Sequence, residues 1–297
     1  MAGASALAGR RILITGAAGF LGSHLTRTLK TAGADVRALT RETGDVTNLD
    51  VLRAAMASAR PDVVFHLAAY GTTSTPRDVA RMRAVNVGGA ENLWAALDVT
   101  DARLVQTGSC AEYAPKDGAL SEADPCVPDS EYAKSLHMAV EFSLDQARRS
   151  GRELVVLRPF GPYGPGDRPE RLIPFVIAGL LGGGRVGVTA GHQQRDFSYI
   201  TDHVEAFCLA AAVPLTDTGR VYNVGSGCPI SVRALVEKIT ALVGGDAASR
   251  IDFGTVAPRP DDRADRYADI GAATRELGFL PSVSLDEGLR LTIGAMR

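Results

Sequence analysis

The chain has 297 residues, of which 32 are Lys or Arg and 34 are Asp or Glu, so its formal net charge is −2. This balance argues against nucleic acid or an anionic membrane as the main partner, because both favour a surplus of positive charge. No apolar run reaches the ~18–20 residues that cross a bilayer, and the first residues lack the charged start of a signal peptide. The four cysteines show no paired spacing, which predicts a reducing, cytoplasmic setting without a metal cluster.

Short β-rich runs alternate with helical patterns over the first two-thirds of the chain. The expected strands are Arg11–Thr15, Asp35–Leu39, Asp62–Leu67, Arg103–Thr107 and Glu153–Arg158. Each is apolar on nearly consecutive residues, which is typical of strands buried on both faces of a parallel sheet. The expected helices are Leu21–Ala32, Leu49–Ala59, Val79–Asp98 and Tyr132–Ser150. The alternation predicts right-handed crossovers and an α/β fold with a doubly wound, Rossmann-type parallel sheet.

The pattern changes after Arg158. Residues 159–169 are rich in Pro and Gly, which excludes a helix or a central strand. Gly219–Val224 is a candidate strand that returns to the main sheet, and Ser231–Val243 is a candidate helix. We therefore expect a dinucleotide-binding domain over 1–165, to which 195–228 return, and a smaller substrate lobe built from 166–194 and 229–297.

A glycine-rich loop joins the first strand to the first helix. Residues 14–22 read Ile-Thr-Gly-Ala-Ala-Gly-Phe-Leu-Gly. In this spacing Gly16 allows a tight turn, Gly19 lets the backbone approach a diphosphate, and Gly22 lets helix and strand pack closely. Free N–H groups and the helix dipole then hold the anion. Strand, loop and helix occur in the order that the motif requires, which favours dinucleotide binding over a plain turn.

The end of the second strand bears on the choice of cofactor. NAD sites place a carboxylate there, whereas NADP sites use a basic residue for the 2′-phosphate. This chain has Thr40 and Arg41, followed by Glu42, which is able to bond a ribose hydroxyl. Arg41 has the alternative of being a solvated surface charge. We expect NADP(H), with NAD(H) as the alternative, and we expect Asp45 and Val46 to lie against the adenine ring.

Further motifs follow in a fixed order. They are Thr15–Gly22, His66–Ala69, Asn86–Val87, Ser109, Tyr132, Arg158–Gly166, Arg195–Phe197 and Tyr222–Gly227. Together they resemble the extended short-chain dehydrogenase/reductase family of nucleotide-sugar enzymes over essentially the whole chain. That family includes 4-epimerases, 4,6-dehydratases and 4-keto-6-deoxysugar reductases, all of which move hydride through a bound nicotinamide. The resemblance implies further cofactor contacts at Phe20, Leu21, Leu67, Ala68, Ala69, Asn86, Thr107, Tyr132, Pro159 and Phe160.

Hydride transfer at a carbinol carbon requires a proton carrier at the oxygen, and a tyrosine serves if positive charge lowers its pKa of ~10. In the family a Tyr supplies the proton, a Lys four residues later lowers its pKa, and a Ser or Thr positions the oxygen. Tyr132 and Ser109 match two of these roles, but Leu136 stands where the lysine belongs. Three explanations are open. Lys134 reaches the site through a distorted helix start, His137 or the nicotinamide charge replaces the lysine, or hydride chemistry is slow or lost.

The residues after Ser109 separate the subclasses of the family. Relatives that eliminate water resemble one another in having carboxylates directly after this position. Here Cys110 and Ala111 stand there, and neither acts as an acid or base at neutral pH. Glu112 follows, and in an extended segment it faces the opposite way. We therefore do not expect dehydration.

A nucleotide-diphosphate sugar is the substrate that the resemblance implies, and arginines bind diphosphates through paired hydrogen bonds. By family position, Arg195 and Arg259 are candidates to hold the diphosphate, and Asp262 is a candidate to accept from the nucleoside ribose. Other expected substrate contacts are Leu172, Ile173 and Gly161, the last at a position where many relatives have an Asn. No cluster has the spacing of a metal site.

Three functions follow from these observations. The first is an NADPH-dependent reductase of a nucleotide-linked 4-keto-6-deoxysugar, with Tyr132 as proton donor and Ser109 positioning the keto oxygen. The second is an NAD-dependent nucleotide-sugar epimerase that recycles its cofactor internally. The third is a nucleotide-sugar or dinucleotide-binding protein with decayed catalysis. In relatives the two long helices form a dimer interface, which implies a homodimer.

Overall fold

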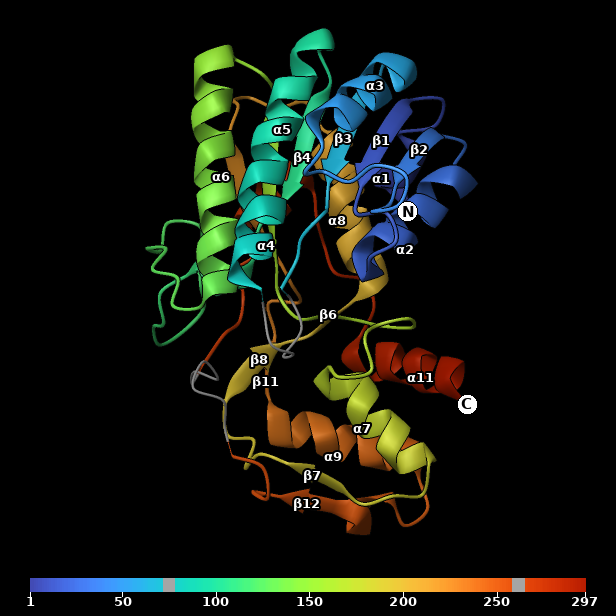
Figure 1. Ribbon diagram of the computed structural model, residues 1–297. Helices are drawn as coiled ribbons and strands as arrows, with labels where there is room; N and C mark the ends of the chain where they lie inside the picture. The colour runs from blue at the N-terminus through green and yellow to red at the C-terminus, as the bar shows by residue number, and fades with distance from the viewer. Residues whose placement is uncertain (72–77, 258–264) are drawn as a thin grey trace.

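A parallel six-stranded sheet forms the upper half of the molecule in Figure 1. The computed structural model describes residues 1–71, 78–257 and 265–297. In spatial order the strands are β10 (Arg220–Val224), β5 (Leu154–Pro159), β4 (Arg103–Thr107), β3 (Val63–His66), β1 (Arg11–Thr15) and β2 (Asp35–Leu39). Every neighbouring pair is parallel. The predicted doubly wound sheet is confirmed, and the segment expected to return to it is β10.

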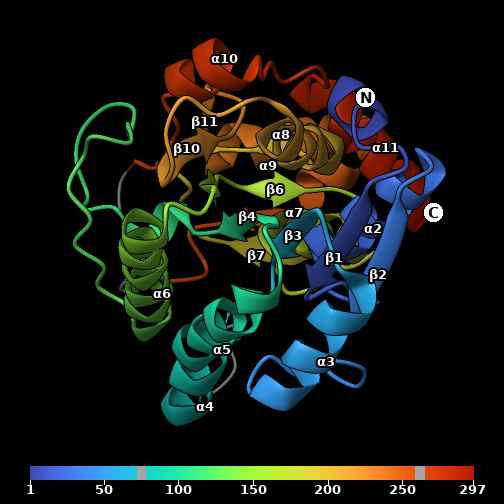
Figure 2. The same ribbon diagram turned by 90° about the horizontal axis from the view of Figure 1, so that it is seen from above.

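Helices cover both faces of this sheet, as the view from above in Figure 2 shows. One face packs against α1 (Ala2–Ser5), α2 (Phe20–Thr31), α8 (Ile200–Ala212) and α10 (Gly271–Leu277). The other packs against α3 (Leu49–Ala59), α5 (Gly89–Ala96) and α6 (Glu131–Ser150). Ile12 and Ile14 of β1 enter the first core and Leu13 the second, since successive strand residues point to opposite faces. Burial on both faces explains why the strands are apolar on nearly consecutive residues.

The helix expected over Val79–Asp98 is interrupted in the structure. It is divided into α4 (Val79–Arg83), a π-helical turn (Ala84–Gly88), α5 and a 3₁₀ turn (Leu97–Val99). Within the π turn Asn86 is buried, and its Nδ2 donates to Ser135 Oγ at 2.8 Å. The prediction of one continuous helix is wrong here, because apolar periodicity does not report the local widening of a π turn, a feature that is frequent at functional sites.

A second group of elements lies below the sheet in Figure 1. It comprises α7 (Leu172–Leu181), β7 (Val186–Val188), α9 (Val232–Val243), β12 (Ile251–Phe253) and α11 (Leu285–Met296), which share a separate apolar core. The helix α9 begins after Ser231, whose Oγ accepts a hydrogen bond from the Ala234 N–H. The segment of α10 was expected in this lobe as well. Instead, its Ala273 and Leu277 pack in the core of the main sheet.

Two short ribbons lie between the halves. β6 (Pro162–Tyr163) pairs with β9 (Ser198–Tyr199) in parallel, and β8 (Gln194–Asp196) pairs with β11 (Pro229–Ser231) in antiparallel orientation. β6 lies within the Pro/Gly-rich stretch that was expected as a loop, and it belongs to a two-stranded pair rather than to the central sheet. In the described part of the chain, no helix has both the length and the apolar composition needed to cross a membrane.

Candidate active site

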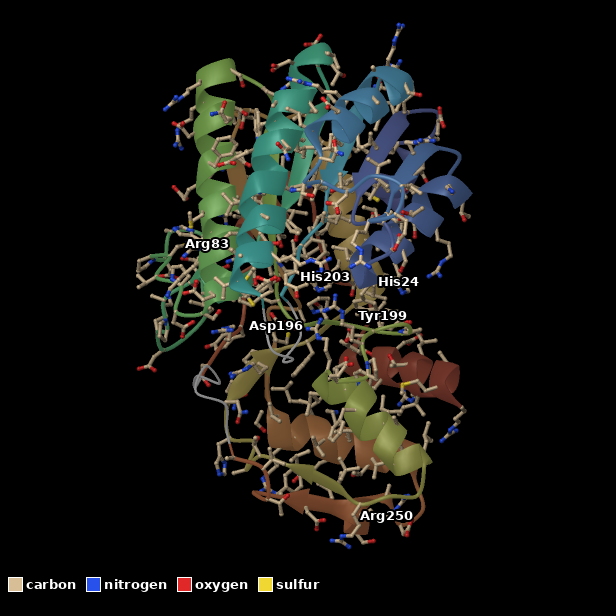
Figure 3. The ribbon with its side chains drawn as sticks, viewed as in Figure 1. His24, Arg83, Asp196, Tyr199, His203 and Arg250 are labelled. Carbon is tan, nitrogen blue, oxygen red and sulfur yellow. The ribbon has the colours of Figure 1, made fainter. Side chains whose placement is uncertain are left out.

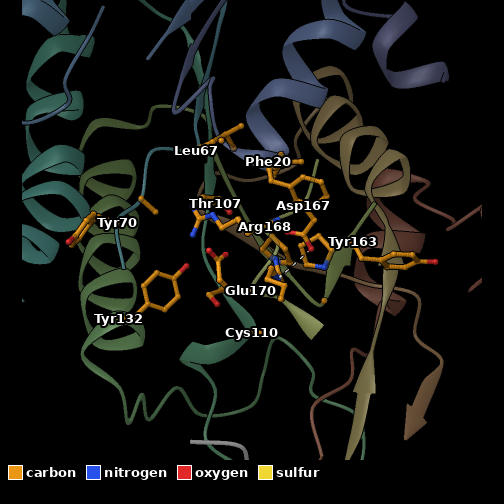
Figure 4. A pocket seen from close by; sticks show the side chains of 18 of the residues that line it. Phe20, Leu67, Tyr70, Thr107, Cys110, Tyr132, Tyr163, Asp167, Arg168 and Glu170 are labelled. Atoms are coloured by element: carbon orange, nitrogen blue, oxygen red, sulfur yellow. Dashed lines mark hydrogen bonds and ion pairs between the residues drawn. The ribbon is translucent and has the colours of Figure 1, made fainter. Parts of the chain in front are cut away.

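A cleft of about 1290 Å³ lies between the sheet and the lower elements. Its upper wall is formed at the carboxyl ends of β1, β3, β4 and β5, the place where open parallel sheets bind their ligands. Its lower wall comes from the start of α7 and from β7 and β8. Figure 4 shows side chains from both walls pointing into the cleft, among them Tyr132, Arg168 and Glu170.

Most residues that were predicted to contact cofactor or substrate line this cleft. On the cofactor side they are Gly16, Gly19, Phe20, Leu21, Gly22, Thr40, Arg41, Asp45, Val46, Leu67, Ala68, Ala69, Thr107, Tyr132, Pro159 and Phe160. On the substrate side they are Ser109, Gly161, Leu172, Ile173 and Arg195. The structure does not bring Asn86 or Lys134 to the wall. Arg259 and Asp262 lie outside the described residues, and their contacts stay predictions.

The glycine loop forms a cradle that side chains would fill. Gly16 has φ +69°, and a Cβ there would lie 2.6 Å from the backbone N of Ala68. A Cβ on Gly22 would lie 2.3 Å from the Gly16 carbonyl O. The helix α2 begins at Phe20 with Gly19 as its N-cap, and no side chain caps it. The first N–H groups of α2 are therefore left for a ligand at the cleft, which is what a dinucleotide diphosphate requires.

We expect Gly16→Ala to weaken NADPH binding at least ~10-fold, because the new methyl group meets the backbone of the adjacent loop. Gly9→Ala is the matched control, since Gly9 has φ +72° with open space around its Cβ position. The control should lose only about 1 kcal/mol of stability and keep its affinity. Calorimetric titration with parallel thermal unfolding checks both variants. Equal affinities would contradict the cradle.

Tyr132 lies in the first turn of α6, which begins after Ser130, whose Oγ accepts from the Ala133 N–H. Lys134 does not share the face of Tyr132, because residues two apart point to different sides of a helix. The Lys134 Nζ instead pairs with Glu131 Oε1 at 2.9 Å, and half of the side chain is exposed. The start of α6 is a regular capped helix. The distortion that would bring Lys134 to the site is not present in it.

The missing lysine has no substitute at the described wall of the cleft, which contains no lysine. Leu136, four residues after Tyr132, is buried. Burial raises the pKa of Tyr132 to about 12, and the positive charges of Arg171 and Arg168 offset this only in part. A phenol with its ordinary pKa of ~10 is already protonated at neutral pH, and burial makes its deprotonation harder still. In this state it is suited to donate a proton rather than to accept one.

Ser109 begins a 3₁₀ turn (Cys110–Glu112) after β4, not the extended segment that was expected. Its Oγ accepts from the Ala111 N–H at 3.1 Å, and its own N–H donates to Glu112 Oε1 at 2.6 Å. This reciprocal capping box fixes Ser109 at the cleft wall. The extended geometry was wrong, but Glu112 is fully buried and does turn away from the cleft.

Glu112 is the centre of a buried charge network. Its Oε2 accepts from Arg158 Nη2 at 3.0 Å and lies 3.4 Å from His137 Nδ1. Arg158 also stacks over the Tyr113 ring, 4.6 Å from its centroid. Among the described residues, one group of metal-binding type is present: ligand atoms of Glu112, Cys126 and His137 lie within 4.8 Å of one another. Because Arg158 already balances the Glu112 carboxylate, we interpret this group as an ion-pair network.

Gly161 is required by the backbone around it. It has φ +43°, and a Cβ there would lie 1.9 Å from the carbonyl O of Asp196. The Asp196 carboxylate is buried and accepts hydrogen bonds from Ser226, Gly227 and Ala268, which hold this segment in place. A side chain at position 161 would therefore demand a backbone shift.

Several residues at the cleft wall were not anticipated from the sequence. They are Tyr70, Arg81, Asp167, Arg168, Glu170, Arg171 and Arg266. Four of them belong to the charged run Asp-Arg-Pro-Glu-Arg that precedes α7. That run was a usable signal, because binding and catalytic residues are disproportionately found on loops that a rigid scaffold positions.

The glycine cradle and the cleft at the strand ends, with Ser109 and Tyr132 at its wall, define a class of protein: a doubly wound, Rossmann-type fold with a smaller lobe across the cleft. The family model for the NAD dependent epimerase/dehydratase family matches residues 12–225. The chain belongs to this family, and the resemblance inferred from its motifs is confirmed.

Several known proteins are similar to this chain over almost its full length. It is 32% identical to a dTDP-glucose 4,6-dehydratase of Streptomyces griseus, over 95% of this chain and 92% of the relative. Among solved structures, MoeE5 in complex with UDP-glucuronic acid and NAD is 30% identical with a TM-score of 0.85, covering 96% and 98% of the two chains. RMD from Pseudomonas aeruginosa, complexed with NADPH, is 25% identical with a TM-score of 0.85 over 96% and 98%.

Proposed function

We propose that this protein is an NADPH-dependent reductase of a nucleotide-linked 4-keto-6-deoxysugar. The observation that carries the proposal is the state of Tyr132. It is a phenol at the cleft wall with no lysine on its helix face, and burial raises its pKa to about 12. An epimerase or dehydratase begins by oxidising its sugar and needs this group as a base, whereas a reductase needs it as an acid.

The surroundings of Ser109 support reduction over dehydration. Cys110 lines the cleft directly after it, and burial raises the pKa of that thiol. The next carboxylate, Glu112, is occupied: one oxygen accepts from the Ser109 N–H and the other from Arg158. Elimination of water needs an acid and a base beside the sugar, and neither group here is available for that work.

In the proposed reaction each group at the cleft has one role. The cleft residues predicted to hold the cofactor, among them Leu67, Thr107 and Pro159, would place a reduced nicotinamide whose hydride would go to the carbonyl carbon of the sugar. Tyr132 donates its phenolic proton to the carbonyl oxygen, which completes the alcohol. Ser109 Oγ already accepts from the Ala111 N–H, so its own proton is left to hold that same oxygen in place.

The preference for NADPH rests on the end of β2. Arg41 lines the cleft there, and no carboxylate takes its place. Glu42 follows, but its Oε2 accepts from Thr40 Oγ1 at 2.7 Å, which engages it within the turn. Similarity to a structure complexed with NADPH supports this choice.

An NAD-dependent epimerase is the second candidate. The likeness that favours it is the one to MoeE5, which was solved with UDP-glucuronic acid and NAD. Denaturing the purified protein and identifying any released dinucleotide distinguishes the two candidates. Copurified NAD(H) would contradict the proposed reductase function and favour an epimerase. A protein that is purified without dinucleotide and prefers NADPH in titrations supports the reductase. We also propose the homodimer that the long helices imply.

Leu136→Lys tests whether the site is adapted or decayed. An ammonium at this position lowers the pKa of Tyr132, so we expect the alkaline limit of ketosugar reduction to move to lower pH while turnover changes by less than ~10-fold. Leu136→Met, which adds no charge, is the control for packing. The pH profile of kcat for the two variants checks the prediction. A rise in turnover of ~100-fold or more in the Lys variant alone would speak for decayed catalysis.

A further inference from the structure

Two arginines from different elements line the cleft near Asp45. Arg41 follows β2 and Arg81 lies on α4, and both line the cleft. In the described part of the chain, the Arg81 guanidinium stacks over the Tyr70 ring, 5.0 Å from its centroid. Among the residues that the structure describes, none accepts a hydrogen bond from the Arg81 guanidinium. Stacking leaves the guanidinium edge, which carries the donors, open to a ligand.

A series of contacts holds Arg81 at this position. The Asn86 side chain clamps the Tyr70 backbone: Oδ1 accepts from its N–H at 2.8 Å, and Nδ2 donates to its carbonyl at 3.0 Å. The Tyr70 ring then supports Arg81. Further along the same helical segment, Asn92 Nδ2 donates to the Val46 carbonyl at 3.0 Å and joins α5 to the segment that contains Asp45. Arg81 is exposed to solvent, but its contact with the Tyr70 ring positions the guanidinium at the cleft.

The turn after Arg41 lies near both guanidinium groups. Hydrogen bonds from Thr47 lower the pKa of the Asp45 carboxyl, and the positive charges of Arg81 and Arg41 lower it further. Asp45 is ionised in this setting and would by itself repel a phosphate. Arg41 also lies close to the Glu42 carboxylate, so the two arginines just balance the two carboxylates of this turn. Loss of either arginine leaves a net negative charge that disfavours a phosphate.

We infer that Arg81 is a second specificity-determining residue for the 2′-phosphate of the cofactor, acting with Arg41 from the opposite element. The inference rests on the proposed use of NADPH. A 2′-phosphate monoester presents three oxygens and up to two negative charges, which two guanidinium groups satisfy together. A ribose hydroxyl carries no such charge, so the pair discriminates between the two cofactors.

The test compares 2′,5′-ADP with 5′-AMP, two fragments that differ only in the 2′-phosphate. Calorimetric titration gives the affinity of wild type, Arg41→Ala, Arg81→Ala and Arg83→Ala for each. Arg83 is the matched control: it lies on the same helix, is 65% exposed and pairs with Glu131 at 3.7 Å. Figure 3 shows it beside α6. Thermal unfolding verifies that each variant is folded.

Arg81→Ala and Arg41→Ala should each weaken 2′,5′-ADP about 10- to 100-fold, the effect of one charge-assisted contact, with 5′-AMP and the Arg83→Ala variant unchanged. If wild type prefers 2′,5′-ADP and Arg81→Ala keeps that preference, the Arg81 assignment fails while NADPH use survives. An equal loss for both fragments also overturns it, because Arg81 would then serve the 5′-phosphate. A wild-type protein with no preference overturns the proposed cofactor itself.

Discussion

Tyr132→Phe is expected to lower kcat for ketosugar reduction by ~10²- to 10⁴-fold, the usual range for loss of a general acid. The variant keeps the ring at the cleft wall and removes the phenolic hydroxyl that carries the proton. The affinity for NADPH should change much less than kcat, because Tyr132 is one of many expected cofactor contacts. Single-turnover assays with a reduced cofactor, together with binding titrations, separate the two effects.

Wild-type reduction should also show a late alkaline limit. The acid must be protonated to work, so activity is present below its pKa and lost as the pH rises through about 12. Tyr199→Phe is the matched control, because Tyr199 is buried edge-on against Tyr163 and does not line the cleft. Similar losses in the Tyr132 and Tyr199 variants, or an alkaline limit near neutrality, would contradict the role of Tyr132.

The sheet could be predicted from the sequence because its signals are local. Strands buried on both faces are apolar along most of their length, as β1 is over Ile12, Leu13 and Ile14. The glycine loop could also be predicted, because a residue with a side chain does not fit beside the Ala68 backbone at position 16. No local sequence pattern indicates the π turn around Asn86. Its cause is a set of hydrogen bonds to Tyr70 and Ser135 that exists only after folding.

Site residues could be predicted where their position follows from the end of a strand or helix. They could not be predicted where their role depends on a contact with a residue far away in the sequence. Ser109 and Tyr132 are at strand and helix ends, so their position followed from the topology. Arg81 lies on a helix that carries one other exposed arginine, Arg83, and only its contact with Tyr70 sets it apart. The reason that Glu112 is unavailable for catalysis, its pairing with Arg158 46 residues away, is likewise tertiary.

That pairing carries the largest expected effect on stability. In Glu112→Ala the Arg158 guanidinium, of which only 4% is exposed, loses its counter-ion, and the Ser109 N–H loses its acceptor. Breaking one side of a buried ion pair costs about 3–5 kcal/mol. Turnover should fall as well, because the capping box that fixes Ser109 is gone.

Two further variants locate the source of this loss in urea unfolding. Asp252→Ala removes a carboxylate from an exposed pair with Arg185 and should cost less than about 1 kcal/mol. In Glu112→Leu/Arg158→Leu both buried charges are replaced by apolar groups, so the double variant should be more stable than Glu112→Ala, although Ser109 still lacks its acceptor. If Glu112→Ala unfolds at the urea concentration of Asp252→Ala, the network is solvated and does not hold the site. If instead the double variant is the least stable of all, the interior depends on the ion pair itself and not merely on avoiding an unpaired charge.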